Sequence, residues 1–482
     1  MSKCAIIIML LFVLSCGKAN TSSTGSSSSD DGGGSSATGA GDDATIEGTG
    51  LSGAEEVSGT VITVAGTTIA GATVYIPGVT ATAGSGSATR TFTQALTATD
   101  GTVCEDAPAA DEALVVACTA ADGSFILDTS GLTTNPTQVV IQKGSLRIIV
   151  PLSCSANICV IDSSYTTVGS SSAVTVWPKV AVVTGSLDRM EDVLAKMADD
   201  DTSDDTNGDY GRVSSSDGKY VYGSEDGTNL TIIDGNGATT SEENGLVYKD
   251  WDKYLDGTYA LLENGSPVFD LIFINCGNAY ESSVVTNKAA LQNYVNAGGR
   301  LFVTDQAYDF IEQAFPYVMK FEGDSDTATT PGTLGAAQTG VGGEQYDALI
   351  NSTGMKTWLG SVTSNRHNSS TPGNPDVDCS DTGTQDVLTG ALLGSGLMPL
   401  GGLLNNWAHM TGSHSGYSPT TWISSGSTAI DGLTNRPLTI SMSIGSSGGK
   451  VVYSSYHTAN TCASTTFWPQ ERALEFLILE SF

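Results

Sequence analysis

The stretch FDLIFINCGNAYESSVVTNKAALQNYVNAGGRLFVTD, residues 269–305, decides the fold of the C-terminal half of the chain. It opens with an apolar run, FDLIFINCG (269–277), and closes with a second one, RLFVTD (300–305). Between them, TNKAALQNYVNAGG (286–299) predicts a helix. Continuous apolar strands joined by a helix are typical of a parallel sheet that is covered on both faces.

The same succession of strand, turn and helix occurs on both sides of this stretch. The further segments are KVAVVTG (179–185), LDRMEDVLAKM (187–197), TNLTIIDG (228–235), GKVVYSSYHT (449–458) and PQERALEFLILESF (469–482). We therefore expect an α/β domain over residues 178–482, with a mostly parallel, flavodoxin-like sheet and a loop-rich insertion at about 323–440. In such sheets ligands bind at the carboxyl ends of the strands.

This order of elements resembles the class I glutamine amidotransferase-like fold, in particular its trehalose-utilisation-like branch. The residues that carry the resemblance are FDLIFIN (269–275), YVNAGG (294–299) before RLFV (300–303), and the late Tyr456-His457. Active relatives have a nucleophilic Cys after the strand that here ends in Thr304-Asp305-Gln306, and His457 matches the position of their histidine. Asp305 stands in place of that Cys, so the covalent thioester mechanism lacks its usual nucleophile.

Cys276 offers a replacement thiol, because it sits at a strand end and is the cysteine expected to stay unpaired. It could meet His457, with Asp305 or Glu281 orienting the imidazole, as thiolate activation requires an adjacent base. The alternative is a buried structural thiol, since free Cys is among the most buried residue types. A short distance between Cys276 and His457 in an open cleft favours an enzyme, whereas burial of the thiol favours a binding protein.

An N-terminal antiparallel β-sandwich is expected over residues 57–170. Short alternating runs punctuated by Gly, Asn and Pro predict its strands: VSGTVITVAGTTIAGATVYIPG (57–78), SFILDTSGL (124–132) and TQVVIQKGSLRIIVPL (137–152). The segment resembles the carboxypeptidase regulatory-like, prealbumin-like domain. The matching residues are Gly59-Thr60-Val61, Ile69 to Val74, and Thr119 to Phe125, with an Ala- and Thr-rich insertion at about 80–117. Members of that family are mostly non-catalytic spacers.

The first residues predict export. Lys3 precedes an apolar run, Ala5 to Leu14, that is too short to anchor a protein in a bilayer. Val13-Leu14-Ser15-Cys16 resembles the lipobox of bacterial lipoproteins, which implies a signal peptide over residues 1–15 and acyl chains, palmitate among them, on Cys16. Gly17 in place of Asp favours the outer membrane, with either a periplasmic or a surface-facing position. The Ser- and Gly-rich remainder of residues 16–56 is expected to be a disordered tether.

The nine cysteines include Cys4 in the signal peptide and Cys16 at the lipid, which leaves seven in an oxidising compartment. Local disulfides are expected between Cys104 and Cys118 and between Cys154 and Cys159. Cys276, Cys379 and Cys462 remain, and the sequence does not determine which two of them bond. The preferred pair is Cys379 with Cys462, because both lie in polar loops.

An acidic run, DDDTSDDTNGDYG (199–211), resembles the calcium loops of dockerin-like repeats. Carboxylate and amide oxygens at alternating positions could converge on a hard cation. The candidate ligands are Asp205, Asn207, Asp209 and the nearby Asp217. The closing bidentate Glu is missing, so a solvated acidic loop is the alternative. Calcium is the one cofactor that the sequence suggests.

Two functional classes follow. The first is a non-catalytic envelope lipoprotein whose α/β domain binds a glycan, peptidoglycan or protein, with Trp251, Trp358, Trp407 and Trp422 either stacking on a ligand or packing in the core. The second is a cysteine-dependent hydrolase or amidase using Cys276 and His457. The formal net charge of −32 opposes binding to nucleic acid, so the expected partners are the membrane, through Cys16, and envelope ligands.

Overall fold

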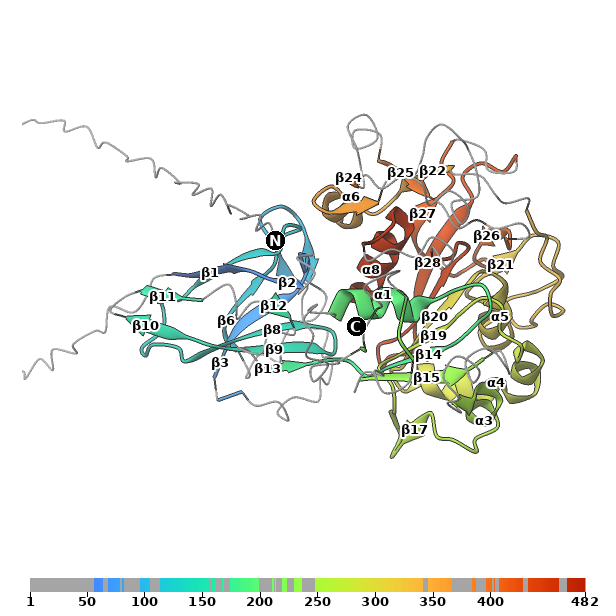
Figure 1. Ribbon diagram of the computed structural model, residues 1–482, viewed down its shortest axis with the longest axis horizontal. Coiled ribbons are helices and arrows are strands. Elements are labelled where there is room, and N and C mark those ends of the chain that lie inside the picture. The colour runs from blue at the N-terminus through green and yellow to red at the C-terminus, as the bar shows by residue number, and fades with distance from the viewer. Residues whose placement is uncertain are drawn as a thin grey trace, which may run out of the picture. The chain divides into compact units, whose positions relative to one another are not determined.

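The computed structural model describes residues 56–63, 68–78, 96–104, 113–155, 158–161, 174–198, 219–222, 229–235, 248–340, 346–365, 396–400, 407–427, 432–458 and 466–481, with a few shorter pieces between them (Figure 1). Over these residues the protein is mostly β, with several sheets and few helices. The predicted signal peptide, Cys16 and almost all of the tether lie outside the described residues. Within the described part, no helix combines the length and the apolar character needed to cross a membrane.

The N-terminal strands form mostly antiparallel sheets, and one short pair, Ile62–Thr63 with Thr167–Val168, is parallel. The largest is a five-stranded sheet in the order β13 (Val174–Val176), β9 (Leu146–Pro151), β8 (Gln138–Lys143), β3 (Thr73–Pro77) and β6 (Ala113–Cys118). A separate antiparallel pair joins β1 (Glu56–Thr60) to β7 (Ser124–Asp128). Smaller elements are β2 (Ile62–Thr63), β4 (Leu96–Thr97), β5 (Val103–Cys104), β10 (Ser153–Ser155), β11 (Ile158–Val160) and β12 (Thr167–Val168).

The turn before β7 shows how the sequence sets this local structure. Gly123 has φ +75°, and a Cβ at this position would lie 2.4 Å from the carbonyl oxygen of Val61. Only glycine therefore fits the second position of the Asp122-Gly123 turn. Phe125, two residues further, is 3% exposed and belongs to the hydrophobic core, as the sequence pattern predicts.

One of the two local disulfides that the sequence predicts, Cys104 with Cys118, is confirmed, whereas the pairing of Cys154 with Cys159 stays a prediction. Cys104 of β5 and Cys118 of β6 form a disulfide. Cys159 is disulfide-bonded and stands opposite Cys154 in the β10–β11 ladder. Cys379 and Cys462 lie outside the described residues, so their predicted pairing stays a prediction.

The C-terminal half is built on one mixed ten-stranded sheet. Its parallel strands are, in order across the sheet, β16 (Lys249–Asp250), β15 (Leu230–Asp234), β14 (Val180–Val183), β19 (Leu271–Ile274), β20 (Arg300–Thr304) and β29 (Gly449–Ser454). The antiparallel strands continue the sheet as β28 (Pro437–Ile444), β27 (Thr420–Ser424), β22 (Tyr346–Ile350) and β25 (Leu397–Leu400).

The segment predicted as a loop-rich insertion, residues 323–440, also contributes strands, because β22, β25 and β27 come from it and extend the main sheet. The connection from β28 to β29 explains the change of direction. Only Gly445-Ser446-Ser447-Gly448 separates the two strands, with φ +67° and +78° at the two glycines. So short a turn permits an antiparallel hairpin, whereas a parallel connection needs a dozen or more residues.

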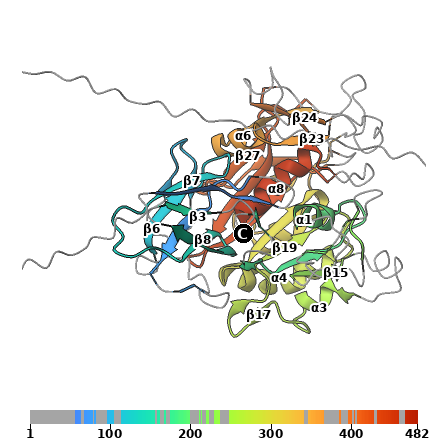
Figure 2. The ribbon, with the colours of Figure 1, turned by 60° about the vertical axis from the view of Figure 1, so that its left-hand side comes forward.

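Helices cover both faces of the parallel strands (Figures 1 and 2). One face packs with α1 (Met190–Ala198) and α8 (Pro469–Ser481), and the other with α3 (Trp251–Leu255), α4 (Glu281–Asn296) and α5 (Asp309–Ala314). Alternate residues of a strand point to opposite faces of the sheet. Val182 of β14 therefore packs in the core on the side of α1 and α8, and Val183 in the core on the side of α3, α4 and α5. A further helix, α6 (Thr353–Leu359), contacts α8.

Candidate functional site

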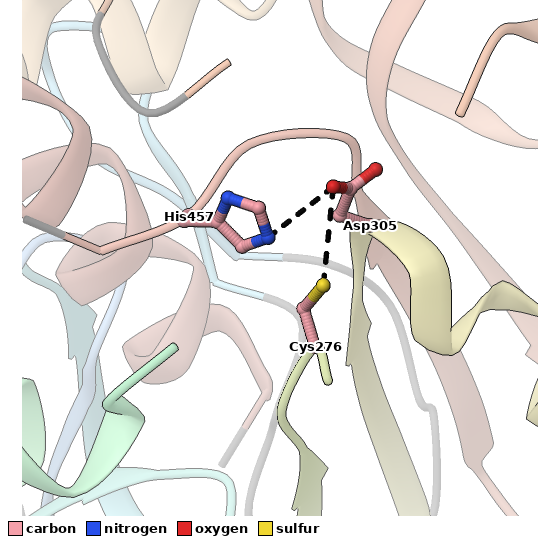
Figure 3. A group of neighbouring side chains, drawn as sticks. All are labelled: Cys276, Asp305 and His457. Carbon is pink, nitrogen blue, oxygen red and sulfur yellow. Dashed lines mark hydrogen bonds and ion pairs between the residues drawn. The ribbon is translucent and has the colours of Figure 1, made fainter. Parts of the chain in front are cut away.

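The carboxyl ends of three neighbouring parallel strands bring Cys276, Asp305 and His457 together (Figure 3). Cys276 follows β19, Asp305 follows β20, and His457 follows β29. The register pairs Ile274 with Val303 and Thr304 with Ser454, so the three strands end nearly level. Side chains at the carboxyl ends of parallel strands meet at the same edge of a sheet.

The donor atoms of the three side chains converge on a small volume. Asp305 Oδ2 lies 3.2 Å from His457 Nε2 and 3.9 Å from Cys276 Sγ. All three donor atoms lie within 4.8 Å of one another. The exposed fractions are 0% for Cys276, 1% for Asp305 and 1% for His457, so the cluster is closed to solvent.

Asp305 occupies a strained turn between strand and helix. Its φ is +38°, a region that few residues other than glycine adopt, and it begins the short 3-10 helix η3 (Asp305–Tyr308) directly after β20. Two contacts hold it there: its Oδ1 accepts the backbone N–H of Ala408 at 2.8 Å, and its carbonyl oxygen accepts the hydroxyl of Tyr453 at 3.2 Å. Strain of this kind is concentrated at functional sites.

The backbone around Cys276 is packed as tightly. Its N–H donates to Thr304 Oγ1 at 2.9 Å. On the other side, a Cβ at Gly185, after β14, would lie 2.0 Å from the Cys276 carbonyl oxygen. The end of β14 therefore requires glycine in order to admit the Cys276 peptide.

Burial and the neighbouring groups both affect the protonation of Cys276 and His457. It raises the pKa of the Cys276 thiol above its ordinary value, although the neighbouring His457 acts in the opposite direction. Burial by itself lowers the pKa of His457, but the Cys276 and Asp305 groups outweigh it and raise that pKa well above the usual value. A thiol with a raised pKa is the opposite of the activated thiolate that a cysteine nucleophile needs.

The arrangement also differs from a catalytic triad. In a triad the nucleophile and the carboxylate contact different nitrogens of the imidazole. Here Asp305 contacts Nε2, and Figure 3 shows the same side of the ring turned toward Cys276 while Nδ1 turns away. Among the described residues, Nδ1 has no hydrogen-bond partner. No group therefore orients the imidazole from behind, as a triad carboxylate would.

Glu281, the other carboxylate proposed from sequence to orient His457, is not part of this cluster. It begins α4 and is partly exposed. Its pKa is raised to about 7, mainly by burial and further by the carboxylate of Asp309. The structure thus brings together three of the four predicted catalytic candidates.

The remaining sequence predictions divide into two groups. Trp251, Trp358 and Trp407 are fully buried, which contradicts a stacking role on an external ligand and supports core packing. The indole N–H of Trp358, for example, donates to the Thr68 carbonyl oxygen at 2.7 Å. The proposed calcium ligands lie outside the described residues: Asp205, Asn207, Asp209 and Asp217.

Sequence reasoning missed a buried polar layer beside the cluster. Glu191, in the first turn of α1, accepts hydrogen bonds from Asn275 Nδ2 at 3.1 Å and from the hydroxyl of Tyr222. Its pKa is raised to about 7 by burial. Asp188 Oδ1 accepts the backbone N–H of Thr458 at 2.9 Å. The sequence did contain a signal for this layer. Asp188 and Glu191 stand at the start of a predicted helix that follows a buried strand, where an acidic side chain needs a polar partner.

A second set of acidic side chains surrounds Glu312 in α5. Glu312 is fully buried, and neither of its carboxylate oxygens has a hydrogen-bond partner among the described residues. Its pKa is raised to about 9, mainly by burial and in addition by the carboxylates of Asp324, Asp309 and Asp326. Asp326 itself pairs with His414 Nε2 at 2.8 Å. A carboxyl group in these surroundings holds its proton at neutral pH.

One cavity lies away from these groups, against β1, β6 and β7, and measures about 630 Å³. Its lining includes Ser58, Thr99, Val116, Phe125 and Ile126, and the disulfide-bonded Cys118 is its only lining residue of a titratable type. The polar side chains of this lining are the hydroxyl groups of Ser and Thr residues.

No family model matches the chain, and no match is found among curated proteins. The two family resemblances therefore depend on the motifs of the sequence.

Proposed function

We propose that this chain is a multidomain outer-membrane lipoprotein, anchored through lipid on Cys16, whose distal α/β domain binds a glycan, peptidoglycan or protein partner without covalent catalysis. The lipobox-like Val13-Leu14-Ser15-Cys16 supports the anchor, and Gly17 supports the outer membrane. The carboxypeptidase regulatory-like domain, residues 57–170, would serve as a spacer between the tether and the α/β domain, residues 178–482.

The strand order supports an amidotransferase-like, flavodoxin-like α/β domain. When the two-residue strand β16 is left aside, the parallel strands lie in the order β15-β14-β19-β20-β29, which is second, first, third, fourth and fifth along the chain. Flavodoxin-like sheets have this order. The positive φ of Asp305 between β20 and η3 also suits a nucleophile elbow in which Asp replaces the expected Cys.

The burial of Cys276 is the observation that carries the non-catalytic assignment. A nucleophilic thiol must reach a substrate carbonyl, and Cys276 is 0% exposed. The raised pKa of the Cys276 thiol and the lack of a hydrogen-bond partner for His457 Nδ1 among the described residues also support a non-catalytic role. The cysteine hydrolase remains the second candidate, because the donor atoms of Cys276 and His457 lie within 4.8 Å of each other.

Thiol labelling separates the two candidates. In the folded full-length chain, treated with a chelator, we expect Cys276 to react with a maleimide at least about 100-fold more slowly than in the denatured chain, because burial excludes the reagent and disfavours the thiolate. Mass spectrometry of the peptide that contains Cys276 measures the labelling, and Cys276→Ser identifies the signal. Labelling of the folded chain as fast as a free cysteine would favour the hydrolase.

An exposed aromatic pair supports a glycan as the partner. Tyr417 is 38% exposed, and its ring stacks on that of Tyr317 with centroids 4.8 Å apart and an interplanar angle of 28°. The hydroxyl of Ser413 donates to the Tyr417 carbonyl oxygen at 2.9 Å, which fixes the backbone beneath the ring. A rigid aromatic face with a polar tip suits the apolar face of a sugar ring.

We expect Tyr417→Ala to weaken binding of the full-length, detergent-solubilised protein to purified peptidoglycan by about fivefold, since an aromatic stacking contact contributes about 1 kcal/mol. Cosedimentation over a range of protein concentrations measures the affinity. The matched control is Tyr259→Ala, which removes another partly exposed tyrosine, one that lies under the Lys249 ammonium. Equal loss in both variants, or no binding by the unmodified protein, would refute peptidoglycan as the ligand of this surface.

A further inference from the structure

We propose that Cys276, Asp305 and His457 form a zinc site. The three donor atoms are a thiolate sulfur, an imidazole nitrogen and a carboxylate oxygen, all of which are common ligands of zinc. This inference is independent of the glycan-binding role, which concerns a different surface of the described residues.

The distances fit a tetrahedral ion. With zinc bonds of about 2.3 Å to sulfur and about 2.1 Å to nitrogen and oxygen, a tetrahedral site separates N from O by about 3.4 Å and S from O by about 3.6 Å. The observed separations are 3.2 Å between His457 Nε2 and Asp305 Oδ2, and 3.9 Å between Cys276 Sγ and the same oxygen. These two separations each lie within about 0.3 Å of the tetrahedral values, and all three donor atoms lie within 4.8 Å of one another.

The buried imidazole is a second, independent observation. His457 is 1% exposed, and neither ring nitrogen makes a hydrogen bond of good geometry among the described residues. Buried polar side chains nearly always have a partner, so each exception requires an explanation. A metal ion at the point toward which Nε2 is directed supplies that partner (Figure 3).

The surroundings hold the ligands in place before metal binds. Asp305 Oδ1 accepts the Ala408 N–H, which leaves Oδ2 free to face the other two donors. The Cys276 N–H is anchored on Thr304 Oγ1. Partners of this kind orient metal ligands and raise affinity. Each ligand follows a different parallel strand, so a bound ion would cross-link the ends of β19, β20 and β29.

The donor set also selects the metal. Sulfur ligation disfavours the hard cations Mg²⁺ and Ca²⁺, whereas one thiolate, one imidazole and one carboxylate suit Zn²⁺ or its spectroscopic substitute Co²⁺. Three protein ligands leave a fourth position for water or a small ligand. Zinc binding displaces the thiol proton of Cys276 and the Nε2 proton of a protonated His457, and both protons pass to solvent or buffer.

The test uses the full-length protein in detergent, stripped with a chelator and titrated with Zn²⁺ or Co²⁺. We expect about one zinc ion per chain by elemental analysis, and a thiolate-to-cobalt charge-transfer band with Co²⁺. At a free Zn²⁺ concentration about 100 times the dissociation constant, the melting temperature of the protein should rise by about 3 °C. Cys276→Ser and His457→Asn should each weaken binding at least about 100-fold, whereas the control His414→Asn should leave it unchanged.

The outcomes decide the proposal even if a variant does not fold. Absence of a charge-transfer band in the unmodified protein overturns the site directly. A band that persists in folded Cys276→Ser assigns the thiolate to another cysteine and also overturns it. Peptidoglycan binding by Tyr417 is measured separately, so failure of the zinc site leaves the glycan-binding proposal standing, and the converse also holds.

Discussion

Lys196→Met is expected to reduce the free energy of unfolding by about 3–5 kcal/mol, because it leaves a buried carboxylate without its counter-ion. Lys196 Nζ, on α1, lies 3.0 Å from both carboxylate oxygens of Glu471 on α8. The two side chains are only 3% and 2% exposed. Without the lysine, the Trp468 N–H remains as a donor to Glu471. The pair joins α1, which carries Glu191, to the C-terminal helix.

Chemical denaturation measures this loss, and a surface lysine provides the control. Lys253 pairs with Asp252 at 3.2 Å, with side chains 42% and 31% exposed, so Lys253→Met should cost less than about 1 kcal/mol. The double variant Lys196→Met/Glu471→Leu should recover much of the loss, since it removes both buried charges. Equal destabilisation by Lys196→Met and Lys253→Met would show that the buried pair contributes no more than a surface pair.

Glu312→Gln is expected to stabilise the protein at pH 8 by about 2–3 kcal/mol, because it removes an acidic group that folding buries beside other carboxylates. The pKa of Glu312 is about 9 in the folded protein, against about 4.3 in an unfolded chain. Between these values the folded state binds a proton that the unfolded state does not. Stability therefore falls as the pH rises from about 4.3 to about 9. The glutamine side chain does not titrate, so the free energy of unfolding of the variant should lose this part of its pH dependence.

Unfolding free energies at pH 5 and pH 8, in a chelator, check the prediction. The gain from Glu312→Gln should be larger at pH 8 than at pH 5, because pH 5 lies less than about one unit above the unfolded-state pKa of about 4.3 and the loss of stability has only begun there. Glu322→Gln is the matched control, because Glu322 is partly exposed and paired with Arg436 at 3.0 Å, and it should lose up to about 1 kcal/mol. A loss of stability at pH 8 in Glu312→Gln contradicts the assigned environment.

Short-range features of the fold were predictable from the sequence. The apolar runs at 179–185, 269–277 and 300–305 became β14, β19 and β20, and the segment 286–299 lies largely within α4. The Asp122-Gly123 turn and the Cys104–Cys118 disulfide were predictable for the same reason. Backbone conformation at a turn, and the periodicity of a strand or helix, depend on neighbouring residues.

The antiparallel half of the main sheet was not predictable. Strands β22, β25 and β27 come from a segment rich in Gly, Ser and Thr, which has a weak apolar pattern. Their place in the sheet depends on β28, which pairs with β29 through a four-residue turn and offers its other edge to β27. Pairing between strands distant in the chain depends on packing more than on local propensity.

The sequence by itself determined that Cys276, Asp305 and His457 follow apolar strands. Only the tertiary structure decided that their donor atoms converge and that the cluster is closed. Convergence follows from the register of β19, β20 and β29. Closure depends on the segment around Ala408, about a hundred residues from Asp305 along the chain, whose N–H binds the Asp305 carboxylate. Contacts of such long range are set by the packing of the whole sheet, so no local pattern encodes them.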